Sequence, residues 1–313
     1  MSRFLVTGAS GFVGQALCRE LLSRGHDVVG VTRREFHVDD HARFRNLIVD
    51  SIEADSDWSG IPDGVGCVIH LAARVHVMRD TSADPLKEFW KINVDGTRCL
   101  AKAAIERGIT RFVYVSSIKV NGETTNGLNA FTETDEPVPT DDYGQSKLAA
   151  ETSLQGLYEE FGGELVIVRP PLVYGAKVGG NFARLIRLIQ SGVPLPFGAI
   201  RNRRSLVSIE NLVDFLILCA SHPAAADNTF LVSDGDDLST PELVAQIAGA
   251  LGMRSRLLPV PVSMLRLAGR CLGKTNEVQR LTDSLQADIE KSRRLLHWQP
   301  PFSVQDSVRR AVT

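Results

Sequence analysis

Tyr143 and Lys147 form the residue pair in this chain that is best suited to acid–base chemistry. They lie four positions apart, so a helix would place them one above the other on the same face. A free tyrosine has a pKa of about 10 and is a poor base at neutral pH. A fixed positive charge nearby favours the phenolate and lowers that pKa. We therefore predict that Lys147 lowers the pKa of Tyr143, which then exchanges a proton with an alcohol or carbonyl oxygen.

A glycine-rich turn near the N-terminus predicts a phosphate-binding loop. A strand-like run at residues 4–6 leads into Thr7-Gly8-Ala9-Ser10-Gly11-Phe12-Val13-Gly14, and a helix is predicted from about residue 13 to 23. Glycine lets the backbone turn sharply and approach a pyrophosphate closely, and a helix N-terminus offers free N–H groups and a positive dipole end. A glycine triplet alone is a weak signal, but its place between a strand and a helix favours dinucleotide binding over a plain tight turn. A bound dinucleotide would favour a catalytic role for Tyr143 and Lys147 over the alternative, a half-buried tyrosine and a surface lysine on an amphipathic helix.

The end of the second predicted strand bears on the choice between NAD and NADP. An acidic side chain there would hydrogen-bond a ribose 2′-hydroxyl and select NAD, whereas arginine suits a 2′-phosphate. The sequence reads Val31-Thr32-Arg33-Arg34, without a carboxylate at the strand tip. The pattern slightly favours NADP over NAD. Alternatively, the two arginines form a solvated basic loop, or Glu35 turns inward and supplies the carboxylate that would select NAD.

Strand-like runs alternate with helical patterns through the first half of the chain. Apolar runs lie at residues 4–6, 27–31, 46–49, 67–71, 111–115 and 165–168, and further helices are predicted at about 86–107 and after Tyr143. Continuous apolar strands separated by helices are typical of a parallel sheet that is covered on both faces. The pattern predicts an α/β fold with a Rossmann-type doubly wound parallel sheet.

The C-terminal part predicts a smaller, mainly helical substrate domain. After Arg169 the prolines and basic residues become frequent and the elements shorten. Runs at 206–208 and 229–232 look like strands that return to the first sheet, and Thr240 with Pro241 opens a helix as its N-cap. The predicted dinucleotide-binding domain comprises residues 1–172 plus about 205–235, and the predicted substrate domain comprises 173–204 plus 236–313.

Composition excludes several classes of function. The chain has 313 residues, 43% of them hydrophobic, and 35 basic against 37 acidic residues give a net charge of −2. This balance argues against nucleic acid as the main partner. Five scattered cysteines without a Cys-x-x-Cys pair indicate a reducing compartment, and no apolar run approaches the ~18 residues that span a bilayer. We expect a cytoplasmic protein without an integral membrane segment and, since no cluster has metal-ligand spacing, without a metal.

Seven motifs in a fixed order resemble the extended short-chain dehydrogenase/reductases, which include the nucleotide-sugar epimerases, dehydratases and reductases. The motifs are the turn at residues 7–14, Asp50 after the third strand, His70-Leu71-Ala72-Ala73, Asn93-Val94-Asp95-Gly96-Thr97, Val115-Ser116-Ser117, Tyr143 with Lys147, and Arg169-Pro170-Pro171-Leu172-Val173-Tyr174-Gly175. The likeness covers nearly the whole chain. It implies an NAD(P)-dependent enzyme that acts on a UDP-sugar.

The resemblance implies a role for each matching residue. Tyr143 would be the general acid/base, Ser117 would hydrogen-bond the reacting sugar oxygen, and Lys147 would also hold the nicotinamide ribose. Asn93 would support the active-site helix, and Asp50 would accept from the adenine amino group. The implied cofactor-binding set is Gly8, Ser10, Gly11, Phe12, Val13, Gly14, Arg33, Arg34, Asp50, Leu71, Ala72, Ala73, Tyr143, Lys147 and Pro170. The implied substrate-binding set is Ser117, Asn181, Arg204 and Arg280. Asn181, Arg204 and Arg280 would bind the diphosphate of the substrate; the alternative for each is an ordinary surface residue.

The two residues after Ser117 narrow the reaction. In the family's 4,6-dehydratases an Asp-Glu pair stands there and moves protons at C6 and C5, but this chain has Ile118 and Lys119. A dehydratase is therefore disfavoured. The strand tip favours reduction, and the segment from Ser116 to Glu123, with Phe131-Thr132-Glu133 downstream, resembles a bacterial subgroup of the family. This resemblance implies a 4-ketoreductase of a UDP-4-keto-6-deoxy-N-acetylhexosamine that serves bacterial surface-polysaccharide synthesis. The alternative is a UDP-glucose or UDP-N-acetylglucosamine 4-epimerase.

Three further expectations concern the chain's partners. A non-catalytic dinucleotide-binding sensor is disfavoured, because such proteins typically lose the tyrosine or the lysine that this chain keeps. The resemblance implies a homodimer, in which the predicted helix at about 86–107 and the helix after Tyr143 would form a four-helix bundle. Residues 262–272 are amphipathic and basic, and we expect them to pack as a helix in the substrate domain rather than on a membrane surface.

Overall fold

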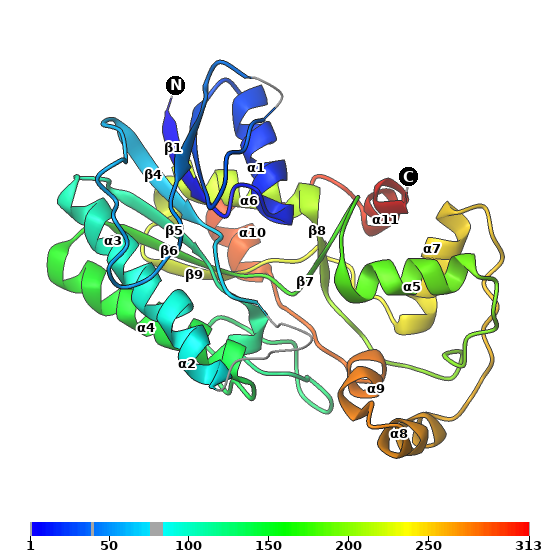
Figure 1. The fold of residues 1–313 in the computed structure, drawn as a ribbon. Coiled ribbons are helices and arrows are strands. Elements are labelled where there is room, and N and C mark those ends of the chain that lie inside the picture. Colours follow the sequence, from blue (N-terminus) through cyan, green and yellow to red (C-terminus); the bar gives the residue numbers. More distant parts are fainter. Residues whose placement is uncertain (1, 39–40, 76–83, 313) are drawn as a thin grey trace.

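A parallel sheet forms the centre of the protein, seen in a computed structural model that describes residues 2–38, 41–75 and 84–312. Within these residues seven strands pair in the order β3-β2-β1-β4-β5-β6-β9, every neighbouring pair being parallel (Figure 1). Their bounds are β1 Arg3–Thr7, β2 Asp27–Thr32, β3 Phe44–Ile48, β4 Val65–His70, β5 Arg111–Val115, β6 Glu164–Arg169 and β9 Asn228–Leu231. The strand order reverses between β1 and β4, which confirms the predicted Rossmann-type doubly wound sheet.

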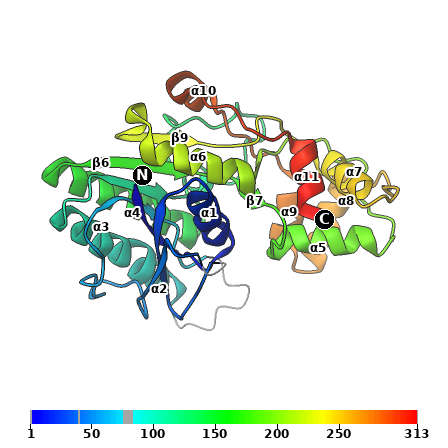
Figure 2. The same cartoon turned by 90° about the horizontal axis from the view of Figure 1, so that it is seen from above.

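Helices cover both faces of the sheet (Figures 1 and 2). Alternate strand residues point to opposite faces, so Phe4 and Val6 join one core cluster while Leu5 joins the other. The first cluster is closed by α1 and α6, and the second by α3 and α4. The helix bounds are α1 Phe12–Ser23, α3 Thr97–Glu106, α4 Asp142–Phe161 and α6 Ile209–Ser221. Helix α10, Glu290–Leu296, packs beside the edge strand β9.

The predicted helix at about 86–107 is interrupted by a wide turn. Helix α2, Pro85–Trp90, continues into the π-helical segment η1, Lys91–Gly96, and then into α3. A Cβ atom on Gly96 would lie 2.3 Å from the carbonyl oxygen of Ile52. At this position the segment therefore approaches the loop after β3 too closely for a side chain. Such turns often occur at functional sites, and η1 carries Asn93.

A second group of helices surrounds a separate small sheet. Strand β7, Leu172–Tyr174, pairs in parallel with β8, Leu206–Ser208. The predicted return of residues 206–208 to the main sheet is therefore wrong, whereas the predicted return of 229–232 is confirmed by β9. The helices of this group are α5 Gly180–Gln190, α7 Thr240–Ala250, α8 Val262–Cys271, α9 Thr275–Thr282 and α11 Val304–Val312. Two short 3-10 turns lie outside the group: η2 Ile118–Val120 follows β5, and η3 Pro223–Ala225 follows α6.

Helix α7 begins one residue earlier than predicted. Ser239 is the N-cap, because its hydroxyl accepts from the backbone N–H of Glu242 while the Glu242 carboxylate accepts from the Ser239 backbone. The Thr240 hydroxyl instead donates to the carbonyl of Leu281 at 2.7 Å. The reciprocal pair satisfies two N–H groups of the first turn, which a cap at Thr240 would not do.

The described residues contain neither a membrane-spanning helix nor a cluster of metal ligands. In that part of the chain no helix is long and apolar enough to cross a membrane. The same residues contain no group of three or more His, Cys, Asp or Glu side chains that could hold a metal ion. The cysteines, Cys18, Cys67, Cys99, Cys219 and Cys271, are free thiols.

Candidate active site

The predicted site residues gather where the parallel strands end. The glycine turn follows β1, Arg33 and Arg34 follow β2, Asp50 follows β3, Leu71-Ala72-Ala73 follows β4, Ser117 follows β5 and Pro170 follows β6. Because the carboxyl ends of parallel strands meet at one edge of the sheet, segments far apart in sequence converge there. In open α/β sheets ligands bind at this edge, near the point where the strand order reverses.

Lys147 lies on α4 and reaches back into the sheet. Its side chain is only 2% exposed, and its Nζ donates to the carbonyl of Val115 at 2.8 Å. The ammonium also lies 4.5 Å from the ring centroid of Tyr114, a cation–π distance. Burial lowers the pKa of Lys147 to about 7, while the nearby Glu151 carboxylate acts in the opposite direction.

Tyr143 lies one helical turn before Lys147, in the first turn of α4. Its phenol is half-buried and hydrogen-bonds the side chain of Ser117, and its ring contacts Phe89 with 6.2 Å between centroids. Burial raises the pKa of Tyr143, and the Asp141 carboxylate raises it further. The prediction that Lys147 lowers this pKa is therefore wrong for this structure, because the ammonium is directed to the backbone of β5 and the charge that acts on the phenol is that of Asp141.

A buried ion pair fixes α4 against the sheet. The guanidinium of Arg169, at the end of β6, donates to the Glu151 carboxylate through Nε at 3.0 and 3.2 Å and through Nη2 at 2.5 Å. Arg169 also donates to the side chain of Asn121 at 3.1 Å. Sequence reasoning missed these residues. The signal was present, since Glu151 continues the four-residue spacing of Tyr143 and Lys147 on one helix face.

Asn93 connects the segment after β4 to helix α4. Its side-chain amide exchanges hydrogen bonds with the backbone N–H and carbonyl of Arg74, at 2.8 and 3.1 Å, and donates to Ser146 at 2.9 Å. The Ser146 hydroxyl in turn donates to the carbonyl of Tyr143 at 2.8 Å. This geometry fits the supporting role that the family resemblance implies for Asn93.

The glycine turn forms a cradle against α1. Gly8 has a φ of +66°, and the Gly11 N–H donates to the Gly8 carbonyl at 2.9 Å. A Cβ atom on Gly14 would lie 2.1 Å from that same oxygen. Helix α1 has Gly11 as its N-cap, no side-chain cap bond and no acidic residue in its first turn. The first amides of α1 therefore face an anion site rather than a capping side chain, which fits a dinucleotide pyrophosphate.

A neutral histidine holds the backbone opposite this cradle. The Thr7 hydroxyl accepts from the N–H groups of Leu71 and Ala72 at 3.2 and 3.1 Å, and lies 2.6 Å from His70 Nδ1. With its acceptor sites filled, the hydroxyl donates to Nδ1, so His70 carries its proton on Nε2, 2.9 Å from Thr97. Burial lowers the pKa of His70 to about 3. His70 is thus a positioning residue that the family motif contained but sequence reasoning left without a role.

The residues that were predicted to bind the adenosine part of the cofactor lie on the surface. Asp50, Arg33 and Arg34 are all exposed, and they lie side by side because Thr32 of β2 is in register with Ile48 of β3. Pro170 is buried, and its carbonyl accepts from the N–H of Ile118 at 3.0 Å. This bond ties the turn after Ser117 to the end of β6.

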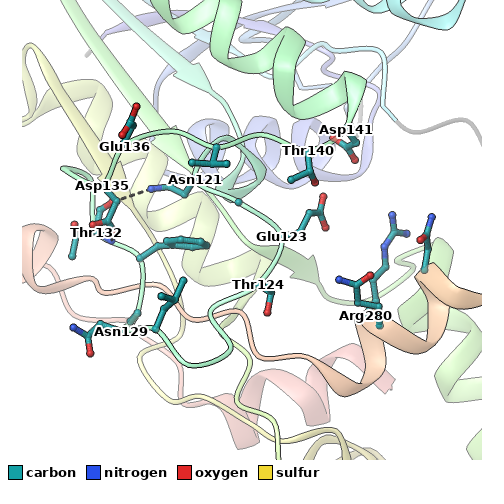
Figure 3. Close-up of a pocket in the computed structure, with 17 residues that line it drawn as sticks. Asn121, Glu123, Thr124, Asn129, Thr132, Asp135, Glu136, Thr140, Asp141 and Arg280 are labelled. Carbon is teal, nitrogen blue, oxygen red and sulfur yellow. Dashed lines mark hydrogen bonds between the residues drawn. The ribbon is translucent and has the colours of Figure 1, made fainter. Parts of the chain in front are cut away.

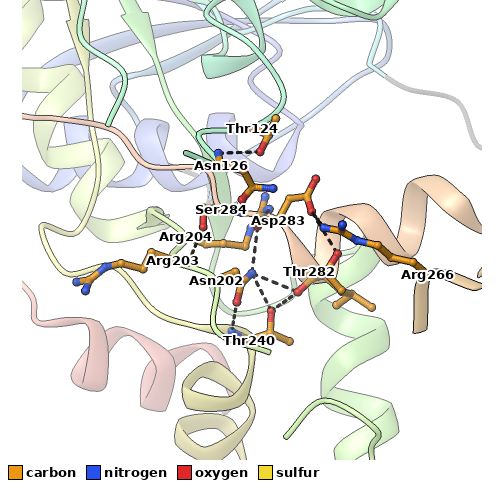
Figure 4. A network of polar contacts seen from close by, with 11 residues as sticks. Thr124, Asn126, Asn202, Arg203, Arg204, Thr240, Arg266, Thr282, Asp283 and Ser284 are labelled. Carbon is orange, nitrogen blue, oxygen red and sulfur yellow. Dashed lines mark hydrogen bonds and ion pairs between the residues drawn. The ribbon is translucent and has the colours of Figure 1, made fainter. Parts of the chain in front are cut away.

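The predicted diphosphate ligands do not form one cluster. Arg204 is half-buried and donates to the carbonyl of Asp283 at 3.1 Å, within a polar network that also contains Asn202 and Thr240 (Figure 4). Burial lowers the pKa of Arg204, and Arg280 is close enough to act as a like charge. Asn181 is exposed in the first turn of α5 and does not line the cavity that contains Arg280.

A cavity of about 940 Å³ opens beside the start of α4 (Figure 3). It lies between α9, which supplies Arg280, and the loop at 121–141, which supplies Glu123 and Asp141. Lys119 forms ion pairs with both of these carboxylates, at 2.6 Å to Glu123. The lysine that replaces the dehydratase glutamate therefore pairs with two acids at the cavity wall and offsets part of their negative charge.

The chain is similar to known proteins over nearly its whole length. Residues 4–233 match the NAD dependent epimerase/dehydratase family. A protein of Vibrio cholerae named UDP-glucose 4-epimerase is 45% identical over 307 residues, which are 97% of this chain and 93% of that protein. The crystal structure of UDP-N-acetylglucosamine 4-epimerase from Bacillus cereus matches with a TM-score of 0.80 and 23% identity, over 99% of this chain and 97% of that one. The crystal structure of UDP-glucuronic acid 4-epimerase from Bacillus cereus in complex with NAD matches with a TM-score of 0.80 and 21% identity, over 99% of this chain and 95% of that one.

Proposed function

Because the chain belongs to the NAD-dependent epimerase/dehydratase family, we propose that it is an NAD-dependent UDP-sugar 4-epimerase. The observation that carries the proposal is the hydrogen-bonded pair of Ser117 and Tyr143, set beside Lys147 at the carboxyl edge of the sheet. The relative at 45% identity is named as a 4-epimerase, which supports this reaction over the 4-ketoreduction that the sequence favoured.

The residues divide the chemistry at C4 between them. NAD, when bound, would supply the hydride chemistry at C4, in which the hydride removed from one face of the sugar is returned to the opposite face. Tyr143 takes the proton of the 4-hydroxyl and later gives it back, and Ser117 hydrogen-bonds the same oxygen. Lys147 in its charged form would hold the nicotinamide ribose, as the family resemblance implies. Glu151 promotes that charged form, because its carboxylate opposes the effect of burial on the pKa of Lys147.

Asp141 is expected to set part of the pH dependence. Its negative charge raises the pKa of Tyr143, so Asp141→Asn should lower that pKa and move the acidic limb of the kcat–pH profile to lower pH. Asparagine remains a good N-cap, and the bond that Asp141 accepts from the Gly144 N–H at 2.7 Å should persist. The neighbouring Asp142 is exposed, and Asp142→Asn is the control. A limb that moves to higher pH, or moves equally in both variants, contradicts the assignment.

NAD is the proposed cofactor, although the strand tip after β2 favoured NADP. The structure of a relative contains NAD, and an epimerase that returns its hydride has no need of the reduced NADP pool. Arg33 and Arg34 are both exposed, so neither is held in a phosphate site by contacts within the chain. We expect a lower Michaelis constant for NAD than for NADP, and a strong preference for NADP would restore the reductase reading.

The substrate side and the oligomer are also proposals. The cavity that Arg280 lines adjoins Asp141, two residues before the catalytic tyrosine, so we propose that the sugar nucleotide enters along it. Arg280, which lines the cavity, and Arg204, which lies close enough to feel its charge, would bind the diphosphate, with Asn181 as a weaker candidate because it does not line this cavity. We retain the predicted division of the chain into a dinucleotide domain and a substrate domain, and a homodimer.

Product analysis separates the two leading reactions. Purified protein would be incubated with NAD and either UDP-glucose or UDP-N-acetylglucosamine, and in parallel with NADPH and a UDP-4-keto-6-deoxy-N-acetylhexosamine. The proposal expects the C4 epimer in the first incubation, seen by NMR, with no net formation of NADH. Stoichiometric oxidation of NADPH in the second incubation, with no epimer in the first, would establish a 4-ketoreductase instead.

A further inference from the structure

Helix α8 has apolar side chains on two opposite faces. Its inner face carries Val262, Leu265 and Gly269, and a Cβ atom on Gly269 would lie 2.7 Å from Val278 of α9. This face confirms the first half of the prediction for residues 262–272, since α8 packs as a helix within the C-terminal group. The second half, which disfavoured a membrane surface, concerns the opposite face. At 3.6 residues per turn, Met264 and Leu267 lie on the opposite face. There they are 59% and 62% exposed.

The outward face continues to the end of the helix. Cys271, one turn after Leu267, is also exposed, and Leu272, just beyond the helix, is 71% exposed. We call Met264, Leu267, Cys271 and Leu272 the α8 stripe. In Figure 1 the helix lies at the outer edge of the molecule, away from the central sheet. A contiguous exposed apolar stripe on a helix of this kind marks an interaction surface.

The segment that carries the α8 stripe is basic, and the first acidic residues that follow it are Glu277 on α9 and Asp283, which pairs with Arg266. Residues 243–276 contain five arginines and lysines and no aspartate or glutamate, although acidic residues slightly outnumber basic ones in the whole chain. Arg270 follows Leu267 by three positions on α8, so it flanks the apolar stripe, and Lys274 lies in the turn between α8 and α9. Long basic side chains beside an exposed apolar helix face are typical of helices that lie in a membrane interface.

We propose that the α8 stripe docks on the surface of an anionic lipid bilayer. A second copy of this chain fits less well, because a symmetric interface would place the cations of one stripe against those of the other. Anionic headgroups supply the opposite charge, and the acyl boundary receives Met264, Leu267 and Leu272. The inference does not depend on which reaction the enzyme catalyses.

The docked helix would hold the cavity near the bilayer. Arg266 on α8 forms a 2.8 Å ion pair with Asp283, and the backbone carbonyl of Asp283 accepts from Arg204 (Figure 4). Helix α9, which packs on α8, supplies Arg280 to the cavity wall. The stripe is therefore connected rigidly to the cavity, and bilayer docking would orient the cavity mouth.

Vesicle co-sedimentation of the full chain tests the proposal. Wild-type protein should bind vesicles of phosphatidylglycerol with phosphatidylcholine, bind phosphatidylcholine alone much less, and release as salt rises. Replacing both Met264 and Leu267 by serine should weaken binding by about 10-fold or more. Replacing Arg270 and Lys274 by glutamine should remove the salt-dependent part. Phe161→Ser is the matched control, since Phe161 is 58% exposed at the end of α4 and its loss should change nothing.

A fluorophore on Cys271 gives an independent readout. An environment-sensitive label there should shift to the blue on adding anionic vesicles. Circular dichroism and thermal unfolding of each variant would show that the surface changes leave the fold intact. The proposal is overturned if wild-type protein does not bind anionic vesicles, or if neither double variant binds less. It is equally overturned if the serine variant changes only the oligomeric state, since a second copy would then cover the stripe.

Discussion

Tyr143→Phe is expected to lower kcat by roughly 10²- to 10⁴-fold while leaving NAD affinity close to that of the wild type. The substitution removes the phenolic oxygen that hydrogen-bonds Ser117 and that we propose exchanges the sugar proton. It retains the ring and its contact with Phe89, so the start of α4 should keep its packing. Steady-state kinetics with the UDP-sugar would give kcat, and isothermal titration calorimetry would give the NAD dissociation constant.

Tyr158→Phe is the matched control for this prediction. Tyr158 lies on the same helix and is 5% exposed, and its hydroxyl has no hydrogen-bond partner among the described residues. Removing that hydroxyl should therefore leave kcat unchanged and leave stability unchanged or slightly higher. If Tyr143→Phe kept full turnover, or if Tyr158→Phe lost as much, the proton transfer could not be assigned to Tyr143.

The sheet was predictable because burial on both faces forces long apolar strands, and these are visible in the sequence. The main error, the place of residues 206–208, has a physical cause. A three-residue apolar run is compatible with either sheet, and its partner depends on long-range contacts. Strand β8 joins β7, and Ser208 N–H and the Tyr174 hydroxyl both donate to Asp234, at 2.8 and 2.7 Å. A residue 26 positions away thus helps to position the strand.

The position of the proposed catalytic residues at one edge of the sheet could be predicted from the sequence, whereas their electrostatics could not. Ser117 and Tyr143 lie within motifs of fixed order, and the parallel topology brings such motifs to one edge. The pKa of Tyr143 depends instead on depth and on the direction of the Lys147 side chain, which spacing does not reveal. The Glu151–Arg169 ion pair joins two elements through burial, so only the folded structure identifies it as a pair.

Gly14→Ala is expected to weaken NAD binding by roughly 10- to 100-fold, the equivalent of about 1–3 kcal/mol of overpacking. The new Cβ atom would lie 2.1 Å from the Gly8 carbonyl oxygen and 2.8 Å from the Ala9 Cα. Both are backbone atoms, so no side-chain rotation relieves the clash, and α1 must move away from the turn. That movement breaks the bond from the Gly11 N–H to Gly8 and displaces the helix N-terminus that faces the pyrophosphate.

The same substitution at Gly249 separates this clash from a general effect of alanine in a helix. Gly249 is exposed in α7, and a Cβ atom there meets no neighbour within 4 Å in the described structure. Alanine favours a helix over glycine by up to about 1 kcal/mol, so Gly249→Ala should raise the unfolding midpoint slightly and leave NAD affinity unchanged. Calorimetric titration and thermal unfolding of both variants provide the comparison. Wild-type NAD affinity in Gly14→Ala would mean that the turn adapts, and that close packing of α1 on Gly8 is not what shapes the cradle.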